Sequence, residues 1–216
     1  MKLVEHPLTI EKHCFLMNNQ RSMYWKKQRM LIIADLHLGK SAHFRKNGFA
    51  VPSFTHQTDL DRLSRLITYY KVDRVVVVGD FIHAKSNKEV IDFLAFTQKH
   101  SLVEFVLIKG NHDRLSDTFL YSIGINEIST DLVCDGVLFI HEPPITSTEQ
   151  ITISGHYHPG VQLQLLKNKY KRLPCFVVDN QQIILPAFST FTGLDSTKEY
   201  KNPTYYAFYD NGFVRV

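Results

Sequence analysis

Five short polar segments, each directly after an apolar run, constrain this chain more than any other feature of its sequence. The apolar runs are 30–34, 74–78, 105–109, 137–140 and 151–154, and their length and composition are typical of buried strands. The segments that follow them are Asp35-Leu36-His37, Gly79-Asp80, Gly110-Asn111-His112-Asp113, His141 and Gly155-His156-Tyr157-His158. Because functional groups collect at strand ends in α/β sheets, the pattern predicts one shared site.

The rest of the chain alternates helical and strand patterns and then turns to strands alone. Two amphipathic helices are predicted, one over 59–70 after a Thr58 cap and one from an Asn87 cap to 99. The expected inner face of the second helix consists of Val90, Ile91, Leu94 and Thr97. Later strands are predicted at 161–166, 175–178, 182–185, 205–209 and 213–216, the last two joined by a tight turn at Asn211-Gly212. No repeat or linker divides the sequence, so residues 1–216 are predicted to form a single domain.

The polar residues at the strand ends are of the types that bind metals. Two aspartates, one asparagine and four histidines make up the set: Asp35, His37, Asp80, Asn111, His141, His156 and His158. Such oxygen and nitrogen ligands suit Mn, Fe, Zn, Ni or Co better than a thiolate site would. Seven ligands fit two divalent ions about 3.5–4 Å apart, which can activate a shared water as hydroxide near neutral pH. Asp80 is the expected bridge, because a carboxylate offers one oxygen to each ion.

Any one of these histidines could be an ordinary loop residue. The recurrence of five clusters in this order makes coincidence a poor explanation for the set as a whole. The order D-x-H, G-D, G-N-H-D, H, G-H-x-H, from Asp35 to His158, resembles the calcineurin-like metallophosphoesterase superfamily.

The resemblance implies an α/β (α+β) fold, a four-layer αββα sandwich of two mixed β-sheets with helices on both outer faces. It implies that one metal is held by Asp35, His37, Asp80 and His158. The other would be held by Asp80, Asn111, His141 and His156. It also implies that His112 donates a proton to the leaving oxygen, with a simple phosphate contact as the alternative.

Two further segments, ADLHLGKSAHFRKNGFAVP (34–52) and ILPAFSTFTG (184–193), are similar to the bacterial ligase-associated DNA-damage-response metallophosphoesterases. That resemblance implies a manganese-dependent phosphodiesterase or endonuclease acting on DNA in repair. It also implies a functional association with an ATP-dependent DNA ligase and a helicase. His83 stands where many phosphatases of the superfamily have an acidic residue, which favours a nuclease over a phosphatase.

Two other functions stay open. One is a small-substrate phosphatase or nucleotide pyrophosphatase at the same site. The other is a non-catalytic scaffold, which the complete ligand set disfavours. The motifs are closely spaced from Asp35 to His158, which leaves no large insertion to cap the site and favours a polymeric substrate.

Two groups of basic residues are candidates to contact such a substrate. Lys40, His43, Arg45 and Lys46 follow the first motif and could meet the phosphates on either side of the scissile one, with a solvated loop as the alternative. A second run, Lys167, Lys169, Lys171 and Arg172, is interpreted as a solvated hairpin tip, with a nucleic-acid patch as the alternative. The formal net charge of +4 is compatible with a polyanionic partner and does not require one.

The sequence also carries an expectation about location. Its three cysteines, Cys14, Cys134 and Cys175, include no CxxC pair, which favours a reducing compartment. No apolar run is long enough for a membrane span or a signal peptide, so a cytoplasmic protein without membrane association is expected.

Overall fold

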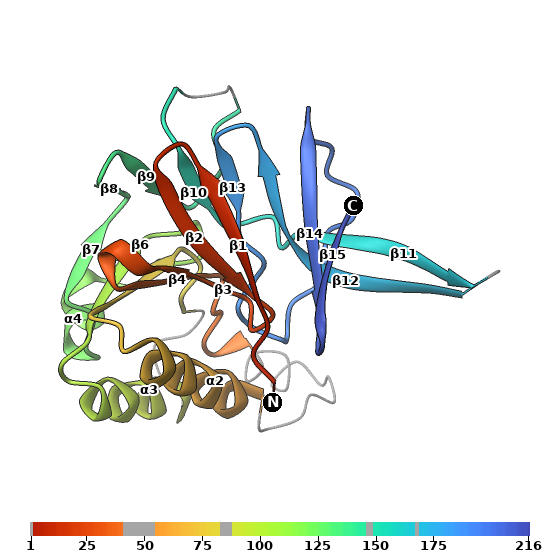
Figure 1. Cartoon of the computed structure of the whole chain (residues 1–216). Coiled ribbons are helices and arrows are strands. Elements are labelled where there is room, and N and C mark those ends of the chain that lie inside the picture. The colour runs from red at the N-terminus through yellow and green to blue at the C-terminus, as the bar shows by residue number, and fades with distance from the viewer. Residues whose placement is uncertain (1, 41–54, 83–87, 146–148, 167–168) are drawn as a thin grey trace.

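Two β-sheets packed face to face form the body of the molecule (Figure 1). The computed structural model describes residues 2–40, 55–82, 88–145, 149–166 and 169–216. The predicted sandwich of two mixed sheets is confirmed.

The first sheet has seven strands in the order β1-β2-β3-β4-β5-β6-β7. Their bounds are β1 Glu5–Ile10, β2 His13–Asn18, β3 Ser22–Trp25, β4 Met30–Ala34, β5 Arg74–Val78, β6 Glu104–Ile108 and β7 Glu127–Ser129. Strands β1 to β4 are antiparallel, and β4 to β7 are parallel. The parallel strands β4, β5 and β6 are buried almost throughout, as their uninterrupted apolar sequences predict.

The second sheet has eight strands, with the main order β15-β14-β12-β13-β10-β9-β8. Their bounds are β8 Asp131–Cys134, β9 Val137–Ile140, β10 Thr152–Ser154, β11 Gly160–Leu166, β12 Lys169–Asp179, β13 Gln182–Ile184, β14 Pro203–Tyr209 and β15 Gly212–Arg215. Strand β10 runs parallel to both β9 and β13, and the other neighbours are antiparallel. Strand β11 pairs with β12 off the main path, and the two extend outwards from the sandwich as a hairpin (Figure 1).

The described α-helices all pack on the outer face of the first sheet (Figure 1). They are α2 Thr55–Tyr70, α3 Lys88–Lys99 and α4 Asp117–Ser122, and the 3-10 turn η1 Lys26–Gln28 does not contribute to this layer. The helices expected on the outer face of the second sheet are not found among the described residues. There, Cys175 and Val177 are covered instead by side chains such as Tyr200, from the segment before β14. No helix in the described ranges is long and apolar enough to cross a bilayer.

Two details of the helices differ from the sequence prediction. Helix α2 already begins at Thr55, so Thr58 lies within it and is not its cap. Ile91 is 68% exposed, whereas Phe93 and Phe96 are buried, so the inner face of α3 is rotated from the expected one. The predicted cap Asn87 lies outside the described residues.

Candidate metal centre

The parallel strands bring the polar segments to one edge of the sandwich. Strands β4, β5 and β6 end side by side, and the Asp35, Asp80 and Asn111 segments follow them. In the second sheet the parallel neighbours β9 and β10 end at His141 and at the His156–His158 segment. The backbone joins the turns: Asp35 donates to the Gly79 carbonyl at 3.1 Å, and Gly155 donates to the His141 carbonyl at 3.1 Å.

Two clusters of ligand atoms result, and Asp80 belongs to both. Asp35, His37, Asp80 and His158 form one group, and Asp80, His141 and His156 form the other, with ligand atoms within 4.8 Å of one another in each. In the first cluster the Nε2 atoms of His37 and His158 are 3.1 Å apart. In the second, His141 Nε2 is 3.2 Å from His156 Nδ1 and 3.1 Å from the Asn111 side-chain oxygen. The structure thus brings all seven predicted ligands together and gives Asp80 the place of a bridge.

The arrangement around His141 fits a bound cation. Its Nδ1 is 3.2 Å from the Val78 carbonyl oxygen, which can only accept a hydrogen bond, so Nδ1 carries the ring proton. When only Nδ1 carries a proton, Nε2 is an acceptor, and it faces two further acceptors, the Asn111 oxygen and an Asp80 oxygen at 3.5 Å. Lone pairs that converge in this way call for a cation, and ligands about 2.1 Å from one ion lie about 3–4 Å apart.

The protonation state of His156 points the same way. Burial lowers the pKa of His156, and the neighbouring His141 lowers it further. The ring is therefore neutral near pH 7, which is the state that a metal ligand needs.

Five of the predicted ligands have a left-handed backbone, which side chains other than glycine seldom adopt. The φ angles are 55° at Asp35, 52° at His37, 48° at Asp80, 72° at His156 and 48° at His158. Each such residue costs roughly 1–2 kcal/mol in backbone strain. These turns therefore need support from the surrounding structure, and concentrated strain of this kind is typical of functional sites.

Asp113 supplies part of that support, and its place in the G-N-H-D segment is the only indication of this role in the sequence. The side chain is 6% exposed, and its carboxylate accepts backbone hydrogen bonds from Phe81, Ile82 and Gly110 at 2.9–3.0 Å. Burial raises the pKa of Asp113, and the three donors oppose that rise. One carboxylate thus ties the turn that carries Asp80 to the turn that carries Asn111.

Gly79 is required where it stands. Its φ is +77°, and a Cβ built on it would lie 1.9 Å from His141 Nδ1. Any side chain at this position would displace the His141 ring from the second cluster.

A second support, also missed from the sequence, lies behind Asp35. Phe188 donates to the Ala34 carbonyl at 2.7 Å, and Ser189 donates to the Asp35 carbonyl at 3.2 Å. Arg62 holds this segment by a short hydrogen bond to the Phe188 carbonyl, and its guanidinium lies 4.2 Å from the centre of the Phe188 ring. We name residues 187–190 the backing segment. It falls within the ILPAFSTFTG sequence, so that motif has a structural role at the metal centre.

The backing segment is also held by charged and polar side chains. Arg62 pairs with Asp59 at 2.9 Å, and both side chains are buried. Asp59 accepts hydrogen bonds from the amide and hydroxyl of Thr190 at 3.3 and 3.2 Å. Arg21 donates to the Ala187 carbonyl at 3.0 Å.

His112 lies at the mouth of the centre. Its ring nitrogen Nε2 is 3.9 Å from an Asp80 oxygen, and its side chain is 47% exposed. Its backbone amide donates to Asp80 Oδ1 at 3.1 Å, which fixes the residue beside the ligands. The ring can therefore reach a group bound in front of the two clusters.

Of the predicted substrate contacts that follow the first motif, the structure describes only Lys40. Lys40 is half-buried; burial lowers its pKa, while Asp80 and Asp35 act in the opposite direction. Its ammonium group therefore lies within the field of the two aspartates of the centre. His43, Arg45, Lys46 and His83 lie outside the described residues.

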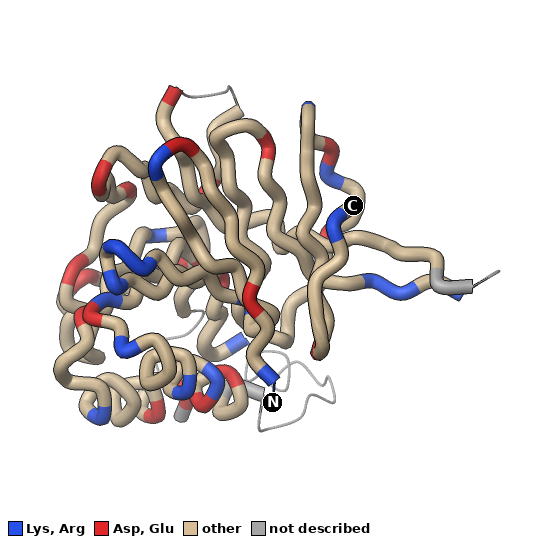
Figure 2. The backbone as a smooth tube through the Cα atoms, in the orientation of Figure 1, with Lys and Arg blue, Asp and Glu red and all other residues tan. Residues whose placement is uncertain are grey.

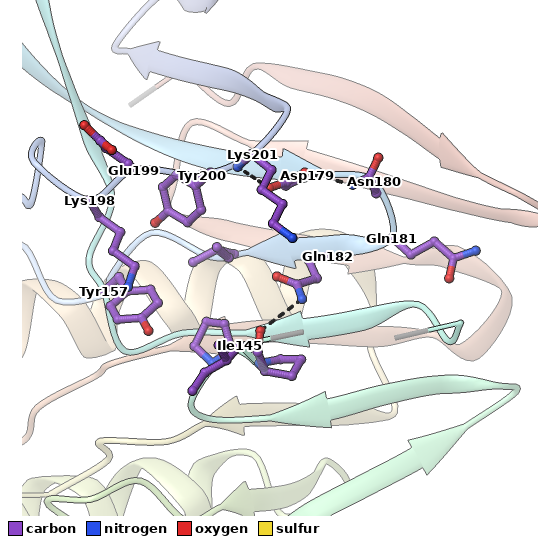
Figure 3. A pocket seen from close by; sticks show the side chains of 13 residues that line it. Ile145, Tyr157, Asp179, Asn180, Gln181, Gln182, Lys198, Glu199, Tyr200 and Lys201 are labelled. Carbon is purple, nitrogen blue, oxygen red and sulfur yellow. Dashed lines mark hydrogen bonds between the residues drawn. The ribbon is translucent and has the colours of Figure 1, made fainter. Parts of the chain in front are cut away.

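Tyr157, between two of the predicted ligands, borders a pocket next to the centre (Figure 3). The pocket volume is about 240 Å³, and its other walls include Ile145, Gln182 and Tyr200. The centres of the Tyr157 and His156 rings are 5.1 Å apart, and the Lys198 ammonium nitrogen lies 4.3 Å from the centre of the Tyr157 ring.

A sandwich of two mixed sheets with aspartate and histidine clusters at one edge defines a metal-dependent phosphoesterase. The chain matches the calcineurin-like phosphoesterase family over residues 28–207 and belongs to that family. The family predicted from the sequence motifs is thereby confirmed.

Several solved structures match the chain, among them the following two. The Pseudomonas putida nuclease MPE superposes with a TM-score of 0.79 and 28% sequence identity, covering 94% of this chain and 96% of that one. The Escherichia coli phosphoesterase Yfce superposes with a TM-score of 0.42 and 11% identity, covering 84% and 88%. No curated protein sequence matches the chain.

Proposed function

We propose that this metallophosphoesterase is a phosphodiesterase that cleaves DNA, with a role in repair. The observation that carries the proposal is the likeness to a nuclease over 94% of the chain at 28% identity. The edge position of the clusters supports it, because the half-exposed His112 and the partly exposed His158 leave the centre accessible to a long substrate.

In this proposal the seven predicted ligands hold two metal ions, with Asp80 shared between them. Bound metals would neutralise phosphate oxygens and lower the pKa of an attacking water. The oxygen and nitrogen ligand set suits manganese, with Fe, Zn, Ni or Co as alternatives.

The chain's own side chains would then orient the substrate and move protons. His112, which lies beside Asp80 with its ring partly exposed, donates a proton to the leaving oxygen. Lys40 places a positive charge next to the two aspartates, where it can meet a non-bridging phosphate oxygen. His43 and Arg45 remain predicted substrate contacts from the sequence alone. The association with an ATP-dependent DNA ligase and a helicase, and the cytoplasmic location, also rest on the sequence alone.

The test is a substrate panel with defined metals. Purified protein is stripped, reloaded separately with manganese and the other candidate ions, and assayed on single- and double-stranded DNA, RNA, nucleotides and nitrophenyl mono- and diesters. We expect diesters to be cleaved faster than the matching monoesters, with manganese among the best activators. Faster turnover of monoesters than of any diester would reject the nuclease function and indicate a small-substrate phosphatase.

A further inference from the structure

The hairpin of β11 and the first half of β12 extends out of the sandwich (Figure 1). We call its described residues, 160–166 and 169–174, the arm. Its two strands pair with each other from Gly160↔Pro174 to Leu166↔Lys169. Among the described strands, β11 pairs with β12 alone, so the arm is a two-stranded extension of the second sheet. An isolated two-stranded hairpin is marginally stable in water, so an exposed arm of this kind needs a reason other than the core.

The two faces of the arm differ in character. Opposite residues of an antiparallel pair share a face, which places Gln162 with Arg172 and Gln164 with Tyr170. All four side chains are exposed, and Tyr170 is 59% exposed. On the other face, the Val161 and Leu173 pair is buried against the second sheet. Packing therefore explains the root of the arm and leaves its polar and aromatic face without a structural role.

Positive charge is concentrated on the arm. From 160 to 174, a range that includes the undescribed residues 167 and 168, the sequence has three lysines, one arginine and no acidic residue, a charge equal to the formal net charge of +4 of the whole chain. The rest of the protein is formally neutral. Figure 2 shows this contrast, with only Lys and Arg coloured along the hairpin and both signs interspersed elsewhere. Lys169, Lys171 and Arg172 are exposed, and no carboxylate of the described chain pairs with them.

Of the predicted basic run, Lys169, Lys171 and Arg172 lie along strand β12, and Lys167 lies outside the described residues. The arm also begins at the metal centre, since Gly160 follows the ligand His158 by two residues. Asp195 fastens this root: its amide donates to the His158 carbonyl at 3.0 Å, and its carbonyl accepts from the Gly160 amide at 2.8 Å.

The length of the arm can be compared with the spacing of phosphates in a nucleic-acid strand. At about 3.3 Å per residue, the level of Arg172 is about 13 Å of chain from His158, and the level of Tyr170 about 20 Å. Successive phosphates of one DNA strand are spaced about 3.4 Å along the helix axis. The span between the two levels thus covers about two phosphates of a strand bound at the centre.

We propose that the arm is a nucleic-acid-binding surface that holds the substrate strand beyond the metal centre. Arg172 contacts a phosphate and Tyr170 stacks on a base from one face of the arm, and Lys169 and Lys171, which alternate to the opposite face, reach neighbouring phosphates around the edge of β12. This inference deepens the proposed function and rests on it. An acidic protein surface would satisfy the charges, but it would give no use to an exposed tyrosine flanked by cations next to a phosphodiester centre.

The test compares two triple variants that each remove three positive charges. The arm variant is Lys169→Ala/Lys171→Ala/Arg172→Ala, and the matched control is Lys12→Ala/Lys26→Ala/Lys99→Ala, at exposed positions outside the arm. Manganese-loaded proteins are titrated against a fluorescent phosphorothioate oligonucleotide at several salt concentrations, with melting temperature and metal content as checks of folding. Tyr170→Ala is titrated separately.

We expect the control to bind like the wild type. In the arm variant the slope of log K against log salt should fall by about 2, because each lost single-strand contact removes about 0.7. Tyr170→Ala should weaken binding at least about fivefold, the lower limit for a stacked base. An arm variant with the salt slope of the control would overturn the inference. So would unchanged DNA binding with lost binding of polyglutamate, which would indicate an acidic protein partner.

The experiment distinguishes an error in the inference about the arm from an error in the proposed function. If the wild type cleaves DNA and the arm variant matches the control, the arm inference is wrong and the nuclease function stands. If the wild type cleaves no diester but binds DNA through the arm, the nuclease function is wrong and the binding surface stands.

Discussion

The buried pair of Asp59 and Arg62 offers a quantitative test of how the metal centre is supported. Both side chains are almost fully buried, at 2% and 5% exposed. Burial raises the pKa of Asp59 and lowers that of Arg62, so each charge is unfavourable without its partner. Asp59→Asn removes one charge while nearly preserving the shape, and it leaves the guanidinium buried with only carbonyl acceptors.

Breaking a buried pair in this way costs about 3–5 kcal/mol. We expect the lower end, about 3 kcal/mol, because an asparagine oxygen can keep one hydrogen bond from Thr190 and the Phe188 carbonyl still accepts from Arg62. For a chain of this length that loss lowers the melting temperature by about 6–12 °C. Urea denaturation of the metal-free protein measures it directly.

A double-mutant cycle separates the charge from the packing. In Asp59→Asn/Arg62→Met no charge remains buried, and the methionine keeps the apolar contact with the Phe188 ring. We therefore expect the double variant to recover at least about 1 kcal/mol relative to Asp59→Asn alone. A loss below about 1 kcal/mol in Asp59→Asn, or strictly additive effects in the double variant, would show that the pair does not hold the backing segment as described.

Two further predictions concern the metal centre itself. Asp80→Ala should abolish activity and lower metal occupancy at both sites, whereas His37→Ala should leave at least part of the second site filled; elemental analysis of the purified variants measures this, and two full sites in Asp80→Ala would reject the bridge. His112→Asn should keep both metals and slow DNA hydrolysis by about 10²–10⁴-fold, with a smaller loss on nitrophenyl diesters, whose leaving group needs little protonation. Equal losses on both substrates would instead assign His112 to phosphate binding.

The two clusters of polar side chains could be predicted from the sequence because each of their parts is local. A buried strand followed by a polar turn is visible in a short window, and β4, β5 and β9 begin and end where the apolar runs do. The backing segment could not be predicted, because its role depends on side chains more than 100 residues away, such as Arg62 to Phe188.

The N-terminal strands β1 to β3 were missed for a different reason. Their turns contain neither glycine nor proline, and the left-handed positions are filled by Glu11 and Arg21, with φ of 51° and 65°. Tight turns are normally recognised by glycine, asparagine or aspartate at such positions. The inner face of α3 was misplaced because Phe93 and Phe96 pack against Phe105 of the sheet, a tertiary contact that helical spacing does not specify.

The left-handed backbone at five of the predicted ligands has a consequence for how this protein can change. Glycine at any of these five positions would relieve strain, so the metal-free fold should gain stability from substitutions that destroy the site. Selection for stability alone would therefore favour inactive sequences. Attempts to stabilise this enzyme in the laboratory should leave the residues of these turns unchanged. A metal bound at this site would offset part of the same strain, since any ligand that binds only the folded state stabilises it. Metal supply in the cell would then govern how much of the protein is folded as well as how much is active.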